Sequence, residues 1–478
     1  MCGIAGWLGP ALDLGLARRM LARLAHRGPD DEGEWRDAEV WLGQRRLSIV
    51  DLSSEGHQPM VSASGRFVIT YNGEVYNHPE LRTEFEKRGH AFRGRSDTEV
   101  MLAAFEAWGV RPALRHFNGM FAFAVWDRKE RALTIVRDRM GEKPLYFAER
   151  DGHFAFASEL TALWDLPWLD KRLDRQALAD YFRYLCVPAP ATIIRGARKL
   201  SPGCGYCWKD GRGEPFAYWR VRDAVDQGLS TPLPADPARS ADELEALLED
   251  AVRIRLRSDV PYGALLSSGV DSSLVAALMQ QQVATPVSTF TIGFREKSHD
   301  ESTYARKIAA HLGTRHAEQI LLPDDVIRLA PEVSRLHDEP FADSSSIPTY
   351  LLARFARQHV TVALAGDGGD ELFGGYPRYF WASRIERLRS TLTPAGAAAL
   401  GGRPAPDARP LRRRQRSGYP GPSVRVVSPV CARRVLPHHR LGLEAARGPA
   451  AGSPGGRRGV LTRVRAHGSA MGGAHDGV

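Results

Sequence analysis

The sequence predicts a sheet-rich α+β domain followed by an α/β domain built on a parallel sheet. Residues 1–210 carry short alternating apolar segments separated by turn residues, which is the pattern of half-buried strands. From residue 241 onward, apolar strands alternate with helices of ten or more residues, as in parallel sheets with helices on both faces. Residues 211–240 lie between them and include a proline-rich polar stretch, so we expect a linker there.

Four strands and two helices are expected in the first domain. The strands are expected at residues 67–71, 120–126, 132–136 and 153–157, and the helices at residues 79–88 and 98–108.

The second domain is expected at residues 241–402 and alternates helix and strand. The order is helix 241–256, strand 262–266, helix 272–282, strand 287–292, helix 302–312, strand 316–321, two further helices and strand 360–365. In a sheet of this kind, ligands bind beyond the carboxyl ends of the strands. Residues that follow those ends are therefore candidates for a binding site.

Bulk composition sets limits on the class of protein. A chain of 478 residues is long enough for two or three domains. It has no apolar run long enough to span a membrane and no secretory signal pattern, so we expect a cytoplasmic protein. Five scattered cysteines argue against a disulfide framework. Cys204 and Cys207 form a Cys-x-x-Cys pair, but without a second pair nearby we expect no zinc.

The net charge of +9 is concentrated near the end of the chain. Residues 411–478 hold 13 arginines, no lysine and two acidic residues, so the preceding residues carry no basic excess. Residues 403–478 are rich in Arg, Gly, Ala and Pro and poor in large apolar residues, so we expect them to be disordered. The tail is either a basic RNA-binding segment or the product of a shifted reading frame, and we favour the second interpretation.

Cys2 directly follows the initiator methionine. If Met1 is removed, a thiol and a free α-amine share one residue, and the amine titrates near pH ~8. The amine could then accept the thiol proton without a separate histidine. The alternative is a small buried apolar cysteine.

Several segments behind Cys2 could form a pocket for an amino-acid amide. Arg46 could clamp a carboxylate in bidentate fashion. The Asn72 side chain and the Gly73 backbone N–H, at the end of a strand, could donate to an oxyanion, while Glu74 and Asp97 could hold an ammonium group. Taken singly, Asn-Gly could be a hairpin turn and Asp97 a helix N-cap.

These segments, together with residues 26–33, 141–146 and 156–160, resemble the glutaminase domain of N-terminal-nucleophile amidotransferases. The resemblance covers nearly all of residues 1–210 and implies an αββα sandwich. It also implies that Cys2 is the nucleophile that releases ammonia from glutamine. Arg46, Asn72, Glu74 and Asp97 would then bind glutamine, with Asn72 and Gly73 at its oxyanion, and residues 26–33 would lie near the pocket.

Two motifs in the second domain suit nucleotide chemistry. Residues 265–273 read Leu-Leu-Ser-Ser-Gly-Val-Asp-Ser-Ser between a strand and a helix, where backbone N–H groups could meet a phosphate. The lack of a following Gly-Lys-Ser/Thr excludes a Walker loop, and a capped turn is the alternative. Residues 365–376 read Ala-Gly-Asp-Gly-Gly-Asp-Glu-Leu-Phe-Gly-Gly-Tyr after another strand and offer carboxylates to Mg²⁺.

With the first domain in front, these motifs resemble glutamine-hydrolysing asparagine synthetases over roughly residues 1–390. The resemblance implies a doubly wound ATP-pyrophosphatase domain and a mechanism through a β-aspartyl-adenylate, with glutamine, aspartate and ATP as substrates. ATP would contact residues at the ends of the strands and in the loop, Asp367 would act in catalysis, and two aspartates would bind Mg²⁺. The implied ATP contacts are Leu266, Ser267, Gly269, Asp271, Ser272, Ile292, Ala365 and Gly366, and the implied metal ligands are Asp271 and Asp370.

Two departures from the family pattern bear on activity. Ser268 stands where many members have glycine, and no counterpart of the family's later helical region follows residue 403. We therefore expect a C-terminally truncated synthetase domain with weak or absent asparagine formation. The rivals are an amidotransferase acting on another carboxylate, such as a sugar uronic acid, a glutaminase alone, or a non-catalytic binding protein. We expect no nucleic-acid or membrane partner, and the chain could form a homodimer.

Overall fold

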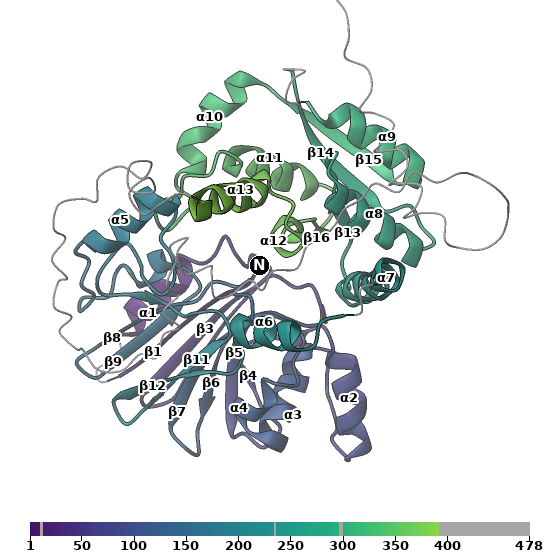
Figure 1. Ribbon diagram of the computed structural model, residues 1–478. Helices are drawn as coiled ribbons and strands as arrows, with labels where there is room; N and C mark the ends of the chain where they lie inside the picture. The colour runs from purple at the N-terminus through teal and green to yellow at the C-terminus, as the bar shows by residue number, and fades with distance from the viewer. Residues whose placement is uncertain (10–12, 234–235, 296–299, 392–478) are drawn as a thin grey trace, which may run out of the picture. The chain divides into compact units, whose positions relative to one another are not determined.

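The computed structural model describes residues 1–9, 13–233, 236–295 and 300–391 (Figure 1). Among these residues, Met1–Ala365 form one compact unit and residues 366–391 belong to a second. The tail predicted to be disordered, residues 403–478, lies outside the described residues, as do the last residues of the predicted second domain.

The first unit begins with an antiparallel sheet of six strands in the order β10-β8-β9-β1-β3-β2. Its strands are β1 (Gly3–Leu8), β2 (Asp31–Arg36), β3 (Val40–Arg46), β8 (Tyr146–Arg150), β9 (His153–Ala157) and β10 (Arg198–Lys199). Strand β1 is bonded on one side to β9 and on the other to β3, so the start of the chain lies inside the sheet rather than at an edge.

A second antiparallel sheet has the order β12-β11-β7-β6-β5-β4. Its strands are β4 (Met60–Val61), β5 (Phe67–Val75), β6 (Gly119–Asp127), β7 (Ala132–Arg137), β11 (Cys204–Lys209) and β12 (Arg212–Ala217). The longest contact in this sheet is the β5–β6 ladder, in which all nine residues of each strand are paired.

Three apolar cores organise these sheets into four layers. Side chains of both sheets meet in one core, for example Ile4 and Leu42 with Val68 and Ala124. The outer face of the first sheet packs on α1 (Leu14–Ala22), the 3₁₀ turn η2 (Leu160–Leu163) and α5 (Arg175–Tyr184). The outer face of the second packs on α2 (His78–Lys87), α3 (Asp97–Trp108) and α4 (Val110–Ala113). The layer order is therefore helix, sheet, sheet, helix.

A third, wholly parallel sheet follows in the order β15-β14-β13-β16. Its strands are β13 (Tyr262–Leu265), β14 (Ser288–Phe294), β15 (Arg315–Leu321) and β16 (Val362–Leu364). On one face lie α7 (Pro237–Arg255), α8 (Val270–Gln282) and α9 (Ser302–Leu312), and on the other lie α10 (Pro323–Val333) and α11 (Ser346–Ala356) (Figure 1). Because all strands are parallel, their carboxyl ends share one edge.

Two helices belong to the second unit, the short α12 (Gly369–Phe373) and the longer α13 (Pro377–Thr391). Helix α12 is bounded by Gly368 and Gly374, whose φ angles of 91° and 70° are in the left-handed region that glycine adopts without strain. The repeated glycines of this motif therefore serve the two ends of a five-residue helix.

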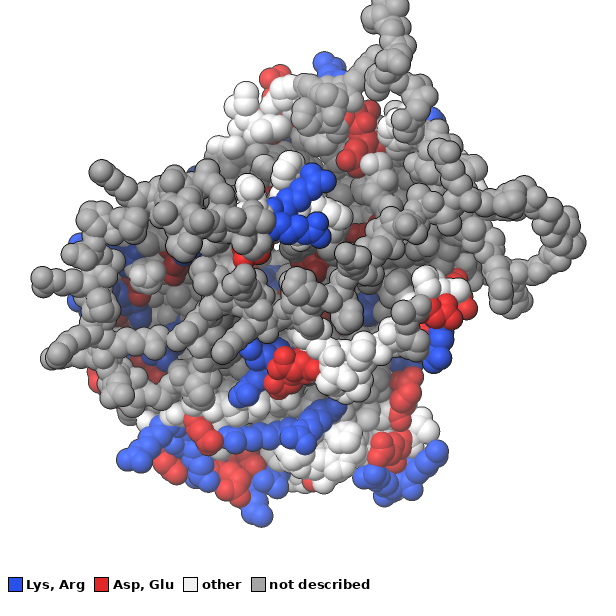
Figure 2. Space-filling model, viewed as in Figure 1, with Lys and Arg blue, Asp and Glu red and all other residues white. Residues whose placement is uncertain are grey.

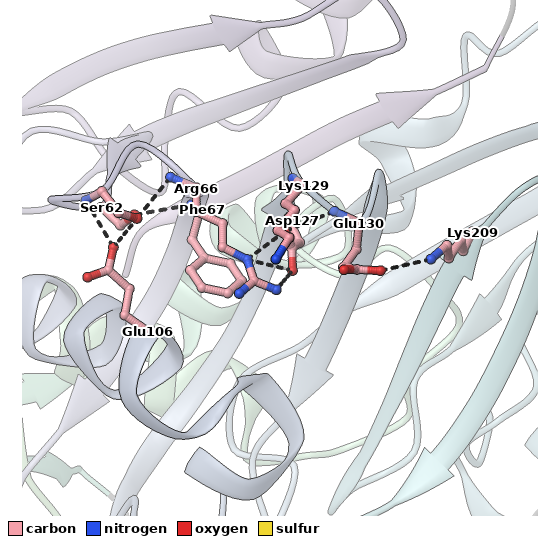
Figure 3. A network of polar contacts seen from close by, with 9 residues as sticks. Ser62, Arg66, Phe67, Glu106, Asp127, Lys129, Glu130 and Lys209 are labelled. Atoms are coloured by element: carbon pink, nitrogen blue, oxygen red, sulfur yellow. Dashed lines mark hydrogen bonds and ion pairs between the residues drawn. The ribbon is translucent and has the colours of Figure 1, made fainter.

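A polar network ties together the second sheet at the ends of β5, β6 and β11 (Figure 3). Arg66 makes a two-pronged contact to the Asp127 carboxylate and lies 4.7 Å from the centre of the Phe67 ring. Lys209 and Glu130 form an exposed ion pair at 3.1 Å. Figure 2 shows the same character more widely, since basic and acidic side chains stand next to one another on the visible face rather than gathering by sign.

The structure adds elements that the sequence analysis did not predict, among them β1, β3, α1 and α5, and it also differs from the prediction in two further segments. Residues 211–240, expected as a linker, contain strand β12 and helix α6 (Val221–Ser230). The Asp210-Gly211 turn, with φ angles of 50° and 73°, folds β12 back onto β11 and was the overlooked signal. Strand β5 extends four residues beyond the predicted end, so the hairpin alternative for Asn72-Gly73 is wrong.

No helix within the described part of the chain combines the length and the hydropathy that crossing a membrane requires.

Candidate active site

The Cys2 thiol lies at the amino-terminal end of β1, next to the end of β3. Its sulfur accepts a hydrogen bond from the Leu47 N–H at 3.4 Å, and the thiol lies 3.6 Å from the Leu47 carbonyl oxygen. The strand is fixed by Ser158, whose Oγ accepts from the Ile4 N–H at 2.9 Å. Burial raises the pKa of the Cys2 thiol, and the Leu47 hydrogen bond opposes that shift. The thiol therefore needs a nearby base to become a good nucleophile.

Two buried cations surround the start of the chain. Arg27 Nε donates to the Cys2 carbonyl oxygen at 2.9 Å, and its Nη1 contacts Glu159 at 2.9 Å. The Lys143 Nζ lies 3.5 Å from the Met1 sulfur. Burial, followed by Arg27 and Lys143, lowers the pKa of the amino terminus to about 6 although the Cys2 thiolate would raise it. An amine in this environment is uncharged at neutral pH and can accept a proton.

Strand β5 brings Asn72 and Gly73 to the same pocket. Asn72 is 1% exposed, and its Nδ2 has no hydrogen-bond partner among the described residues. An unpaired buried donor is costly, so its retention points to a ligand that completes the bond. A side chain at Gly73 would collide with the Met120 carbonyl oxygen on β6, which explains the glycine at this position.

Two acidic side chains line the same pocket, Glu74 on β5 and Asp97 at the start of α3. Asp97 Oδ2 accepts from the Tyr71 hydroxyl at 2.7 Å and from the Val75 N–H at 2.9 Å. The N-cap of α3 is Ser96, so Asp97 is not the cap. Burial, with the nearby Asp97, raises the pKa of Glu74 to about 8, against the opposing effects of Lys143 and Arg255. A cation that entered the pocket would relieve this cost by pairing with Glu74.

Arg46 differs from its predicted state as a free carboxylate clamp. It is the last residue of β3, and its Nη2 donates to the carbonyl oxygens of Val50 at 3.2 Å and Asp51 at 2.5 Å. Its Nη1 lies 3.4 Å from the Ser53 carbonyl oxygen. Much of the guanidinium is therefore used to hold the loop that follows β3.

One pocket collects the thiol, the oxyanion donors and the carboxylates described above. The lining includes every residue of the first domain predicted to bind or attack glutamine, together with Lys143: Cys2, Arg46, Asn72, Gly73, Glu74 and Asp97. A thiol, an unpaired donor, two carboxylates and a buried cation suit an amino acid that carries an amide.

The second candidate site starts where β13 ends. Leu266 is buried and its N–H donates to the Phe290 carbonyl oxygen at 2.9 Å. Ser267 and Ser272 are joined through their hydroxyls at 2.8 Å, and Gly269 precedes helix α8. Ile292 is on β14 and Ala365 follows β16, the two strands that flank β13, so these residues share the carboxyl edge of the sheet.

Glu301 contacts this loop and was missed by sequence reasoning. Its Oε2 accepts from the Ser268 N–H at 3.2 Å and from the Ser268 hydroxyl at 2.7 Å. The carboxylate therefore meets a backbone donor that a phosphate oxygen could use. Ser268 adds a hydroxyl donor that glycine would lack.

The remaining predicted residues are Asp271 in the first turn of α8 and Gly366, Asp367 and Asp370 in the second unit. In that unit the Asp370 carbonyl oxygen accepts from the Gly375 N–H at 3.0 Å. A side chain at Gly375 would collide with the Asp370 carboxylate, so that carboxylate lies over the turn after α12. No cluster of three or more potential metal ligands occurs in the described ranges.

Sequence reasoning also missed Arg27, Lys143 and Glu159 as pocket-side charges. Arg27 and Lys143 stand in segments whose family resemblance was noted, His-Arg-Gly-Pro and Gly-Glu-Lys-Pro, but neither segment marks which residue meets the chain start. Only the fold of β1 beside β9 and β3 places them around Cys2.

Comparison with known proteins agrees with this two-part architecture. Residues 1–219 match the glutamine amidotransferase domain family, and residues 243–445 match the asparagine synthase family. Fold and pocket thus define a two-domain amidotransferase class. Asparagine synthetase B [glutamine-hydrolyzing] of Escherichia coli (strain K12) is 32% identical over 413 residues, which is 81% of this chain and 67% of that protein. The chain belongs to the family of glutamine-hydrolysing asparagine synthetases.

Another relative is asparagine synthetase [glutamine-hydrolyzing] 1 of Bacillus subtilis (strain 168), 35% identical over 365 residues and 76% of this chain. The chain spans 56% of the length of that relative. Among solved structures, glutamine phosphoribosylpyrophosphate amidotransferase from B. subtilis matches with a TM-score of 0.36 and 15% identity, covering 69% of this chain and 70% of that chain.

Proposed function

We propose that this protein makes asparagine from aspartate, using ammonia released from glutamine and energy from ATP. The observation that carries the proposal is the pocket in which the Cys2 thiol, the unpaired Asn72 donor and the buried Glu74 meet. The α/β domain and its loop after β13 support the second half of the reaction.

In the first half-reaction, removal of Met1 frees the Cys2 amine. Burial and the Arg27 and Lys143 charges lower the pKa of the Met1 amine in the chain that retains Met1, and we expect them to favour the neutral form of the Cys2 amine in the same way. That amine takes the thiol proton, and the sulfur attacks the side-chain amide carbon of glutamine. Asn72 and the Gly73 N–H stabilise the oxyanion of the tetrahedral intermediate. The carbon–nitrogen bond breaks as the amide nitrogen takes up the proton held by the Cys2 amine and leaves as ammonia. Water then hydrolyses the thioester to glutamate. Glu74 and Asp97 receive the substrate ammonium, while Arg46 faces its carboxylate.

In the second half-reaction, the aspartate β-carboxylate attacks the α-phosphorus of ATP and pyrophosphate leaves. Ammonia then displaces AMP from the acyl-adenylate to give asparagine. Ser267, Gly269 and Ser272 contact the pyrophosphate, and Asp367 contributes to the formation or use of the adenylate. Leu266, Ile292, Ala365 and Gly366 contact the adenosine.

By resemblance to the family, Asp271 and Asp370 would each offer a carboxylate to Mg²⁺. Carboxylates are suitable ligands, because Mg²⁺ in nucleotide enzymes takes one or two of them and completes its shell with phosphate and water oxygens. A dedicated cluster of three protein ligands is not required. When bound, the ion would neutralise charge on the departing pyrophosphate.

The test measures glutamate and AMP with Mg-ATP and glutamine, with and without aspartate, for the wild type and Cys2→Ala. We expect aspartate-dependent AMP from the wild type, at the weak level predicted from the sequence, and from C2A only when ammonium replaces glutamine. Glutamate without AMP would contradict aspartate as the acceptor and leave a glutaminase or an amidotransferase for another carboxylate. Glutamate production by C2A equal to that of the wild type would contradict the role of Cys2.

A further inference from the structure

The end of helix α7 and the turn after it contact the amidotransferase domain at three alternate positions. The Arg255 guanidinium lies 4.7 Å from the centre of the Tyr76 ring. Arg257 donates to the Tyr76 carbonyl oxygen at 2.5 Å and to the Glu80 carboxylate at 2.9 Å. Asp259 makes the third contact. These three residues belong to the region matched by the synthetase family, not to the region matched by the amidotransferase domain.

Asp259 both donates a hydrogen bond to one loop of the amidotransferase domain and accepts one from it. Its backbone N–H donates to the Ile49 carbonyl oxygen at 3.0 Å. Its Oδ2 accepts from the Asp51 N–H at 2.9 Å and lies 3.6 Å from the Arg95 guanidinium. The Asp51 carboxylate in turn accepts from the Arg95 N–H at 2.6 Å. One side chain of the synthetase region therefore closes a ring of polar contacts around this loop.

The same loop forms a wall of the pocket around Cys2. Ile49 and Val50 line that pocket, and Arg46 donates to the Val50 and Asp51 carbonyl oxygens from the pocket side. Arg46 thus binds carbonyl oxygens of the loop, and the Asp259 carboxylate binds a backbone N–H of the same loop. If the Asp259 contact is lost, both the loop and the direction of the Arg46 guanidinium become less fixed.

We propose that Asp259 is a positioning residue of the glutamine pocket, contributed by the synthetase part of the chain. It acts through the Ile49–Asp51 segment and Arg46 and does not touch the substrate. The inference rests on the glutamine hydrolysis proposed above. Asp259 also stands just before β13, whose other end leads into the Ser267 loop, so one short strand connects this support with the second site.

The test compares glutamine hydrolysis by three variants of the full chain. Asp259→Ala removes the acceptor for the Asp51 N–H, whereas Asp259→Asn keeps an oxygen in that place. Glu80→Ala is the matched control, because it breaks the neighbouring Arg257 contact without touching the pocket loop. We expect D259A to raise KM for glutamine about ten-fold with kcat within about two-fold, because uniform binding is lost. D259N and E80A should stay close to the wild type.

Hydrogen–deuterium exchange of residues 47–55, measured without substrate, gives a second readout that does not need turnover. D259A should speed exchange in this segment, and D259N and E80A should not. The inference is overturned if D259A leaves both KM and exchange unchanged, or if E80A alters them equally, which would indicate general domain docking. A wild type that hydrolyses no glutamine would instead contradict the proposed function, and the exchange result would still decide the role of Asp259.

Discussion

At the scale of single residues, Asn72 is expected to affect the rate of glutamine hydrolysis but not the stability of the fold. Its buried Nδ2 makes no hydrogen bond in the described structure, so Asn72→Ala gives up no folded-state bond from that donor. We expect kcat for glutamine hydrolysis to fall about 100- to 1000-fold, the usual cost of losing one oxyanion donor. The free energy of unfolding should change by no more than about 1 kcal/mol.

Asn77 provides the opposite control. Its side chain donates to the His116 carbonyl oxygen at 2.8 Å and accepts from the Asn118 N–H at 2.9 Å. Asn77→Ala should therefore lower stability by about 1 kcal/mol per lost bond and leave kcat unchanged. Steady-state kinetics and urea unfolding of both variants check this. Equal kinetic loss in the two would contradict the oxyanion role of Asn72.

The shifted carboxyl of Glu74 predicts that the proposed glutamine hydrolysis depends on pH. Its pKa of about 8 leaves the carboxyl largely neutral at pH 7, and an ammonium group binds the ionised form. We expect kcat/KM for glutamine to rise with pH up to about 8. Glu74→Gln should lower kcat/KM and remove this rise, as measured by a pH profile from 6 to 9. A wild-type profile that is flat between 7 and 8.5 would refute the shifted carboxyl.

The same group affects stability with a definite sign. The folded pKa of Glu74 lies above the ordinary value of 4.5. Its contribution to the free energy of unfolding is therefore fully present below pH 4.5. It is lost as the pH rises through about 8. Thermal unfolding should show that the wild type loses stability relative to E74Q as the pH rises through about 8.

At the scale of elements, the segments that were predicted lie close to observed helices and strands, but other regular elements of the first domain, such as β1, β3, α1 and α5, were not predicted. Both ends of helix 302–312 were predicted correctly, because the amphipathic segment there stops at Gly313, whose φ is 72°. Strand β5 was cut short because Asn-Gly is typical of hairpin turns. Pairing with β6 over its whole length overrides that local preference, and this pairing is what carries Asn72 and Glu74 into the pocket.

The candidate site follows the same division. Cys2, Asn72, Glu74 and Asp97 could be proposed from residue type and family pattern, and the structure brings them to one pocket. Arg27 and Lys143 could not be assigned, because their effect arises from burial beside the chain start rather than from spacing. The use of Arg46 to hold its own loop likewise depends on a tertiary path that the sequence does not display.

At the scale of the whole molecule, a buried ion pair joins residues far apart in the chain. Glu339 lies 2.5 Å from the Lys199 ammonium, with side chains 8% and 15% exposed, and also accepts from the Ile193 N–H at 2.7 Å. Glu339→Ala leaves a buried lysine without its counter-ion. We expect a loss of about 3–5 kcal/mol in the free energy of unfolding, measured by urea denaturation.

The exposed pair of Lys209 and Glu130 serves for comparison. Its side chains are 45% and 50% exposed, so Glu130→Ala should change the free energy of unfolding much less than Glu339→Ala does. Similar losses for the two variants would show that burial does not govern the Glu339 contact.

The contact of Asp259 with the Ile49–Asp51 loop bears on modularity. The pocket around Cys2 depends on residues from both matched regions. Asp259, which holds the Ile49–Asp51 loop, lies beyond residue 243, in the region matched by the synthetase family. Transplanting residues 1–219 onto another acceptor domain would therefore carry over the nucleophile but leave behind part of its scaffold. Recombination between such enzymes should succeed more often when the crossover falls after Asp259, with the turn inherited together with the loop that it holds.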